Sequence, residues 1–231
     1  MNIKISKEEN EYLLGRLKER FLIGSRLYGT HTEESDEDVL CLYDDSEMKA
    51  MSPYLCNFLP NYHQFQYDDL ENNRQIIWST TEQFFKNLIS GDSTINADIA
   101  MFYPGVVNNP LQVLRTYKVI KAYIGFAKRD LKDVSKKNKL FHAHRSLYCA
   151  ASLMINTLPT LDGIYRISKD TYSKDDLIDW EWDLRKEVNN MFDQNRLKMY
   201  YIPPMPKSLH TWNTLLNKLT ESNNTKEFKY E

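Results

Sequence analysis

The sequence of 231 residues has little of several features that define whole classes of protein. Its three cysteines, Cys41, Cys56 and Cys149, form no CxxC pair, which argues against a disulfide framework and against a structural zinc site. No apolar stretch approaches the length that spans a bilayer, and the segment MNIKISKEENEYLLGRLKERF contains no run typical of a signal peptide. We therefore expect a protein of the reducing cytoplasm that has no membrane partner.

A strong excess of charge is also missing. Thirty basic and thirty-two acidic residues give a formal net charge of -2 at pH 7, so no global attraction to nucleic acid is indicated, although a local basic patch is compatible with these numbers. The hydrophobic fraction of 42% and the charged fraction of 27% are typical of globular proteins, which excludes extensive disorder and collagen-like repeats. The length allows one large domain or two small ones.

Residues 1–108 show the pattern of a mixed α/β region. Apolar residues at helical spacing predict a helix from Lys7 to about Arg20, with a short buried strand directly after it. Apolar runs bounded by turn-forming residues predict strands, and a second helix ends at a glycine. The predicted strands lie at 21–23, 39–43, 62–67 and 75–78, a polar turn at 68–73, and the second helix at 81–90.

Residues 109–231 show an almost wholly helical pattern. Three long helices are predicted, at residues 111–134, 139–155 and 174–195. The expected fold class is therefore α+β, with a mixed sheet core over 1–108 and a helical C-terminal region over 109–231 that packs on this core.

The segment GSRLYGTHTEESDEDV, which begins at Gly24, combines a glycine turn with paired carboxylates. Gly24 lets the backbone leave a strand sharply and approach a phosphate, Ser25 supplies a hydroxyl, and the next amides can point at phosphate oxygens. Asp36 and Asp38 stand two apart at the mouth of a strand, so period-two geometry sends both carboxylates to one face and Glu37 to the other. Such a pair suits Mg²⁺ or Mn²⁺ bound together with substrate phosphates.

Either half of this motif alone is usually just part of a solvated turn, because short motifs match by accident. The two halves together, between two predicted strands, are more specific. GSRLYG followed by SDEDV resembles the nucleotidyltransferases of the DNA polymerase β superfamily, and in particular a polymerase β family of an RNA-repair pathway. The resemblance implies a nucleotidyltransferase sheet core in which Gly24 and Ser25 bind the triphosphate of a donor such as ATP, and Asp36 and Asp38 bind the metal.

Further matches extend the resemblance over about the first two thirds of the chain. Arg26 and Tyr28 occupy family-specific positions of the motif, which implies nucleotide binding, and residues 84–96 resemble the helix and turn that follow in the family. His142 and Arg145 match a helical His-x-x-Arg, and on one helix face they could reach a phosphate or close over the site. An exposed polar helix face is an equally good interpretation of their spacing.

One position departs from the superfamily pattern. Members generally place a third carboxylate on a later strand, and counting back from the helix at 84 puts Gln75 at that position. A glutamine carbonyl can ligate Mg²⁺ but cannot accept a proton. Asp68, Asp69 or Glu71 would take this place if the strand register differs.

Two functions are compatible with these residues. As a transferase, the protein would use Mg²⁺ or Mn²⁺ to move a nucleoside monophosphate from a nucleoside triphosphate to a hydroxyl of RNA, protein or a small molecule. Its catalytic residues would be Asp36, Asp38 and Gln75. As a weakened pseudo-nucleotidyltransferase, it would hold a nucleotide or RNA without turnover and act as a regulatory or inhibitory binding protein. The neutral side chain of Gln75 is the feature that separates the two.

Overall fold

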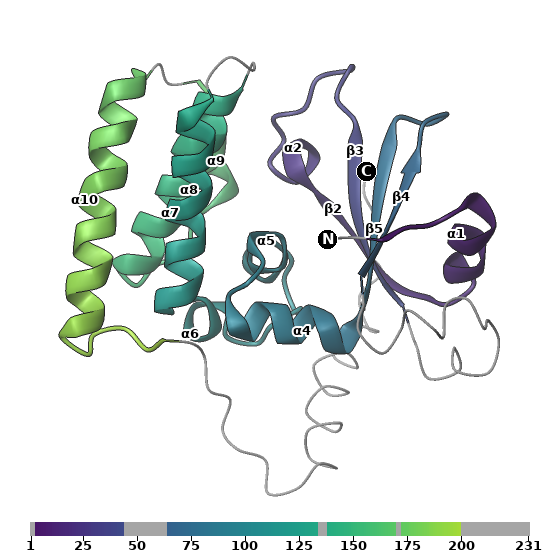
Figure 1. The fold of residues 1–231 in the computed structure, drawn as a ribbon, viewed down its shortest axis with the longest axis horizontal. Helices are drawn as coiled ribbons and strands as arrows, with labels where there is room; N and C mark the ends of the chain where they lie inside the picture. Colours follow the sequence, from purple (N-terminus) through teal and green to yellow (C-terminus); the bar gives the residue numbers. More distant parts are fainter. Residues whose placement is uncertain (1–2, 44–63, 134–137, 170–171, 200–231) are drawn as a thin grey trace, which may run out of the picture. The chain divides into compact units, whose positions relative to one another are not determined.

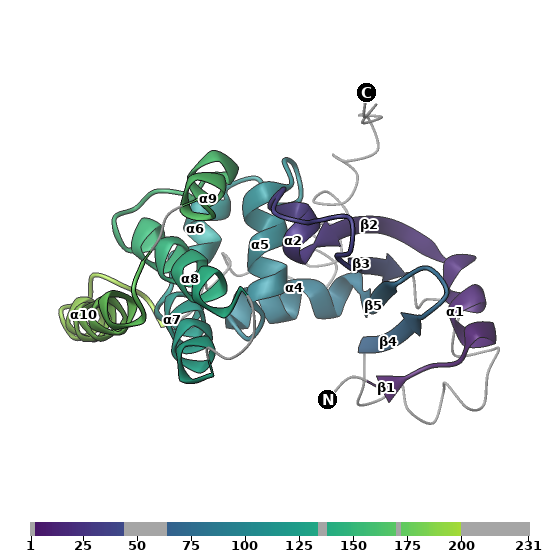
Figure 2. The same ribbon diagram turned by 90° about the horizontal axis from the view of Figure 1, so that it is seen from above.

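A computed structural model describes residues 3–43, 64–133, 138–169 and 172–199 (Figures 1 and 2). The fold is α+β, with a five-stranded mixed sheet and several helices, as the sequence predicted. The chain divides into two compact units, Met1–Lys86 and Asn87–Glu231. This division lies before the change of pattern expected at residue 108, because helices α5 (Thr94–Phe102) and α6 (Pro110–Leu114) pack with each other and α5 packs on a later helix.

The first unit contains the sheet, whose strand order is β1-β4-β5-β3-β2. The pairs β1 with β4 and β3 with β5 are parallel, whereas β2 with β3 and β4 with β5 are antiparallel. Its elements are β1 (Ile3–Lys4), α1 (Lys7–Leu14), β2 (Leu17–Ile23), α2 (Gly24–Leu27), β3 (Glu37–Tyr43), β4 (Gln64–Asp69), β5 (Arg74–Thr80) and the start of α4 (Thr81–Ser90). The predicted strands are therefore present, each with somewhat different ends, although residues 62 and 63 lie outside the described part of the chain.

Helix α1 is shorter than the predicted helix at 7–20. Ser6 caps its first turn, since Ser6 Oγ accepts from Glu9 N at 3.3 Å and Glu9 Oε2 accepts from Ser6 N at 2.7 Å. The helix ends at Gly15, and the chain then pairs with β3 as strand β2. Apolar residues of this segment fit a helical spacing as well, so pairing with a distant strand decides its structure.

One face of the sheet packs against α1 in an apolar layer. This layer consists of Leu13, Val39, Cys41, Tyr43, Phe65, Ile76 and Trp78, all of which are buried. Trp78 Nε1 donates to Asn10 Oδ1 at 2.9 Å, so the polar atom of this large, fully buried side chain is satisfied. Because alternate residues of a strand face opposite sides, the even-numbered residues of β3, starting with Asp38, lie on the other face of the sheet.

The second unit is helical. Helices α7 (Tyr117–Lys132), α8 (Lys139–Met154) and α10 (Lys174–Asp193) pack against one another in both views (Figures 1 and 2) and enclose a core of Ala127, Leu131, Ala143, Leu147 and Leu177. The helices predicted at 139–155 and 174–195 are thus confirmed to within two residues at their ends. Within the described residues, no helix is long and apolar enough to cross a bilayer.

The single helix predicted at 111–134 is wrong, because the chain forms α6 and α7 instead. Arg115 leaves the helical conformation with φ -76° and ψ 64°, and Thr116 Oγ1 accepts from Val119 N at 3.4 Å to start the next helix. Helices α5 and α9 (Leu161–Ile167) and the short strand β1 were not predicted. Helix α5 has a run of five buried residues, which hides the alternation of apolar and polar faces on which periodicity depends.

Candidate functional site

The chain leaves β2 at Gly24 in a conformation that only glycine adopts readily. Its φ is +63°, where L side chains are strained, and a Cβ atom built there would lie 2.9 Å from Asp38 Oδ2. Both the backbone angle and the contact therefore select glycine. The α2 turn begins directly against the Asp38 carboxylate, which brings the two halves of the sequence motif together.

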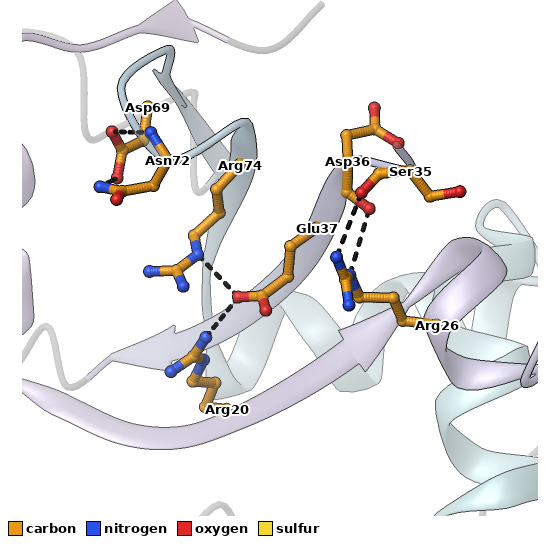
Figure 3. A network of polar contacts seen from close by, with 8 residues as sticks. All are labelled: Arg20, Arg26, Ser35, Asp36, Glu37, Asp69, Asn72 and Arg74. Carbon is orange, nitrogen blue, oxygen red and sulfur yellow. Dashed lines mark hydrogen bonds and ion pairs between the residues drawn. The ribbon is translucent and has the colours of Figure 1, made fainter. Parts of the chain in front are cut away.

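Arg26 braces the loop that carries the first aspartate. Its guanidinium donates from Nε to the carbonyl oxygen of Asp36 at 3.3 Å and from Nη2 to that of Ser35 at 3.1 Å (Figure 3). Thr30 N donates to the Ser25 carbonyl at 3.0 Å and closes the start of the same loop. Nucleotide binding by Arg26, which the resemblance implied, stays a prediction, and in the structure Arg26 contacts these backbone carbonyls.

Tyr28 is the C-terminal cap of α2 and is only 3% exposed. Its side chain is part of the buried core. Ser25, in contrast, is half-buried. Nucleotide binding by Ser25 and Tyr28 stays a prediction, and partial exposure makes Ser25 the better placed of the two.

Asp36 precedes β3, whose first two residues are Glu37 and Asp38, and these three acidic residues have different surroundings. Glu37 Oε1 lies 2.7 Å from Arg20 Nη2 and 2.6 Å from Arg74 Nε (Figure 3). These ion pairs hold Glu37 against two neighbouring strands, on the face of the sheet opposite to Asp38, as the sequence predicted. Glu37 therefore has a structural role, and its charge is already compensated.

The carboxylate of Asp38 carries a charge that the described residues do not compensate. Burial raises the pKa of Asp38 from 3.8 to about 6, and the charge of Asp36 acts in the same direction. A divalent cation would relieve both effects, so this pair fits a metal ion that takes its remaining ligands from substrate phosphates. Among the described residues, no three His, Cys, Asp or Glu side chains gather as a complete protein cage.

Gln75 lies beside Asp38, as its position in the sequence predicted. The parallel register of β3 and β5 pairs Asp38 with Gln75, and the antiparallel register of β4 and β5 pairs Gln75 with Asp68. Residues paired in register share a face of the sheet, so the three side chains form a row across adjacent strands. The position next to the aspartate pair is thus neutral, and the nearest further carboxylate of this row is one strand away.

The other two candidate replacements for Gln75 lie elsewhere. Asp69 follows Asp68 on the opposite face and caps the turn, accepting from Asn72 N at 3.3 Å and from Asn72 Nδ2 at 2.8 Å (Figure 3). Glu71 is exposed within that turn. Of the three alternatives, Asp68 is therefore the one that belongs to the row.

His142 and Arg145 belong to α8 in the second unit. Burial lowers the pKa of His142 to about 4, with a further contribution from Arg145, so the imidazole is neutral at pH 7. The nearby Asp130 is buried, and its Oδ1 lies 2.7 Å from Lys139 Nζ and 3.2 Å from Arg129 Nη2. Nucleotide binding by His142 and Arg145 stays a prediction.

Sequence reasoning missed the partners that support the site. The clamp of Arg20 and Arg74 on Glu37 and the contact between Lys4 and Asp68 join residues on different strands. The charged residues are evident in the sequence, but which of them form pairs depends on the order of the strands. No local pattern reports which strands become neighbours.

No protein-family model matches the chain, and none of the curated proteins matches its sequence. The geometry around Gly24, Asp36, Asp38 and Gln75 is therefore the basis for a function.

We expect Asp38→Asn to raise the free energy of unfolding at about pH 7.5 without divalent cations, by on the order of 1 kcal/mol after allowance for partial exposure. The folded-state pKa of Asp38 is raised to about 6, so its stabilising contribution is present below the unfolded value of 3.8 and is lost as the pH rises through 6. Urea unfolding of both proteins at about pH 4 and about pH 7.5 measures the difference. Equal stability of the two proteins at the higher pH would contradict the inference that the ionised carboxylate of Asp38 is destabilised by burial.

Proposed function

We propose that the protein is a metal-dependent nucleotidyltransferase of the polymerase β type, which moves a nucleoside monophosphate from a nucleoside triphosphate to a hydroxyl group. The observation that carries the proposal is the close approach of the Gly24 turn to Asp38. This approach places a turn suited to phosphate next to a pair of carboxylates suited to a divalent cation. Neither feature alone would favour this activity over a structural role.

The roles of the residues follow from their chemistry. Ser25 and the amides that follow Gly24 would bind the triphosphate, while Asp36 and Asp38 would hold Mg²⁺ or Mn²⁺. When bound, the cation would neutralise negative charge on the phosphates. Arg26 holds the carbonyls of Ser35 and Asp36, so it keeps the first carboxylate near the second.

The transfer itself forms a bond between the acceptor oxygen and the α-phosphorus and breaks the bond to the pyrophosphate oxygen. The acceptor hydroxyl must also lose its proton. Gln75 lies next to Asp38 but has no basic atom to accept that proton. We therefore expect slow turnover, with RNA, a protein side chain or a small molecule as the acceptor.

A second candidate function is supported by the same residue. If the neutral Gln75 leaves the acceptor without a base, the site would still hold a nucleotide or RNA. The protein would then be a regulatory or inhibitory binding protein.

Label transfer separates the two candidates. The full-length protein is incubated with nucleoside triphosphates labelled at the α-phosphate, with Mg²⁺ or Mn²⁺, and with total RNA or total protein. Label on RNA, on another protein or on the chain itself supports the transferase. Nucleotide binding that depends on the cation, without any transfer, supports the binding protein instead. Absence of both would contradict both candidates.

We expect the double substitution Asp36→Asn with Asp38→Asn to abolish nucleotide binding that depends on a divalent cation, because both carboxylate ligands are lost. Calorimetry with Mg²⁺ and a nucleoside triphosphate measures the affinity. The matched control is Glu33→Gln with Glu34→Gln, which removes two exposed charges from the same loop and should leave binding within about twofold. Unchanged affinity in the Asp36 and Asp38 variant would exclude the metal centre.

We expect Ser25→Ala to weaken binding of a nucleoside triphosphate by roughly fivefold, since one hydrogen bond to a charged phosphate is lost. Binding of the corresponding monophosphate should change much less, which makes the monophosphate the internal control. Titration of both nucleotides with each protein measures the two ratios. An equal loss for both would place the serine away from the phosphate tail.

We expect Gln75→Asp to strengthen Mn²⁺ binding or to raise the transfer rate by roughly tenfold, because it adds a third carboxylate next to Asp38. Calorimetry and the labelled-transfer assay measure the two effects. Gln64→Asp is the control, since it adds the same charge to the same face of the sheet, four residue pairs away from the pair of Asp68 and Gln75. An equal gain in the control would show that the effect comes from added negative charge in general and not from a third carboxylate next to Asp38.

A further inference from the structure

Asp68 is the outer member of the row that Asp38 and Gln75 begin. Its Oδ1 accepts from Gln66 Nε2 at 2.8 Å and from Gln75 Nε2 at 3.4 Å, and its Oδ2 accepts from Lys4 Nζ at 2.6 Å. These donors come from three strands. Each of its two carboxylate oxygens therefore already accepts at least one hydrogen bond, which leaves Asp68 poorly suited to bind a cation itself.

The same contacts determine how the amide of Gln75 is turned. The carboxylate of Asp68 forms an ion pair with the ammonium group of Lys4, and a carboxylate accepts hydrogen bonds without donating them. A carboxylate that only accepts must face the NH₂ group of Gln75, in agreement with the contact from Nε2. The carbonyl oxygen Oε1 of Gln75 is then the atom of this amide that is not directed at Asp68.

We propose that Asp68 is a positioning residue for the candidate metal centre, because its contact with Gln75 keeps Oε1 rather than Nε2 available to a divalent cation held by Asp36 and Asp38. This inference rests on the proposed function. An amide turned the other way would present two N–H donors to the cation and would repel it. The orientation of Gln75 thus decides whether the neutral member of the row can be a ligand, and residues behind a metal ligand commonly set that orientation.

Binding of Mn²⁺ alone to the full-length chain tests the role of Asp68. Calorimetry should show an affinity about tenfold weaker for Asp68→Asn than for the wild type, because an asparagine can present either a donor or an acceptor to Gln75. The matched control is Asp69→Asn. This substitution removes the same charge from the next residue of the chain, whose carboxylate contacts Asn72. Its affinity should stay within about twofold of the wild type. Equal losses in both variants would overturn the proposal.

A double-mutant cycle tests whether the effect passes through Gln75. In a Gln75→Met background, where no amide is left to orient, Asp68→Asn should cause no further loss of Mn²⁺ affinity. A loss of the same size in that background would overturn the orientation mechanism. Asp68→Ser is a second variant for both backgrounds, and urea unfolding without metal checks that each variant folds.

The contact itself has a readout without metal. The side-chain NH₂ resonances of Gln75 in an NMR spectrum should shift on Asp68→Asn and not on Asp69→Asn. Resonances that do not respond to Asp68 would overturn the proposal even if the wild type binds Mn²⁺. Wild-type binding of Mn²⁺ that survives loss of Asp36 and Asp38, or no binding at all, would instead overturn the metal centre and the proposed function with it.

Discussion

The site depends on how closely the backbone at Gly24 approaches the carboxylate of Asp38. A Cβ atom at Gly24 would lie 2.9 Å from Asp38 Oδ2, and the backbone angle there is one that L side chains rarely adopt. The antiparallel pairing of Ile23 with Asp38 keeps the turn after β2 beside the start of β3. The brace from Arg26 to the carbonyls of Ser35 and Asp36 keeps the intervening loop in the same place.

The two faces of the sheet place neighbouring carboxylates in different surroundings. Glu37 is held by Arg20 and Arg74, so its charge contributes to packing between strands. Asp38, its neighbour in the chain, faces the other side, where burial and Asp36 raise its pKa. A partly buried carboxylate whose charge no described residue compensates is costly for the apo fold, and a cation would remove that cost.

The row from Asp38 through Gln75 to Asp68 determines what the site can do. In the proposed centre, a neutral residue next to the pair would lower the total negative charge and supply no base, which would favour nucleotide binding over rapid turnover. The carboxylate of Asp68 is one strand further away and is neutralised by Lys4. The two candidate functions therefore share one geometry and differ in whether a proton can be removed from an acceptor.

Features that depend on neighbouring residues could be predicted from the amino-acid sequence. Period two along a strand placed Glu37 opposite to Asp36 and Asp38, and helical periodicity located α4, α8 and α10 closely. Non-local pairing with β3 was needed to make residues 17–20 a strand, because their apolar spacing fits a helix as well. Tertiary structure also decided the partners of Arg26 and the place of Asp68 in the row. Hydrogen bonds between distant segments follow from strand order and register, and the local sequence carries no information on either.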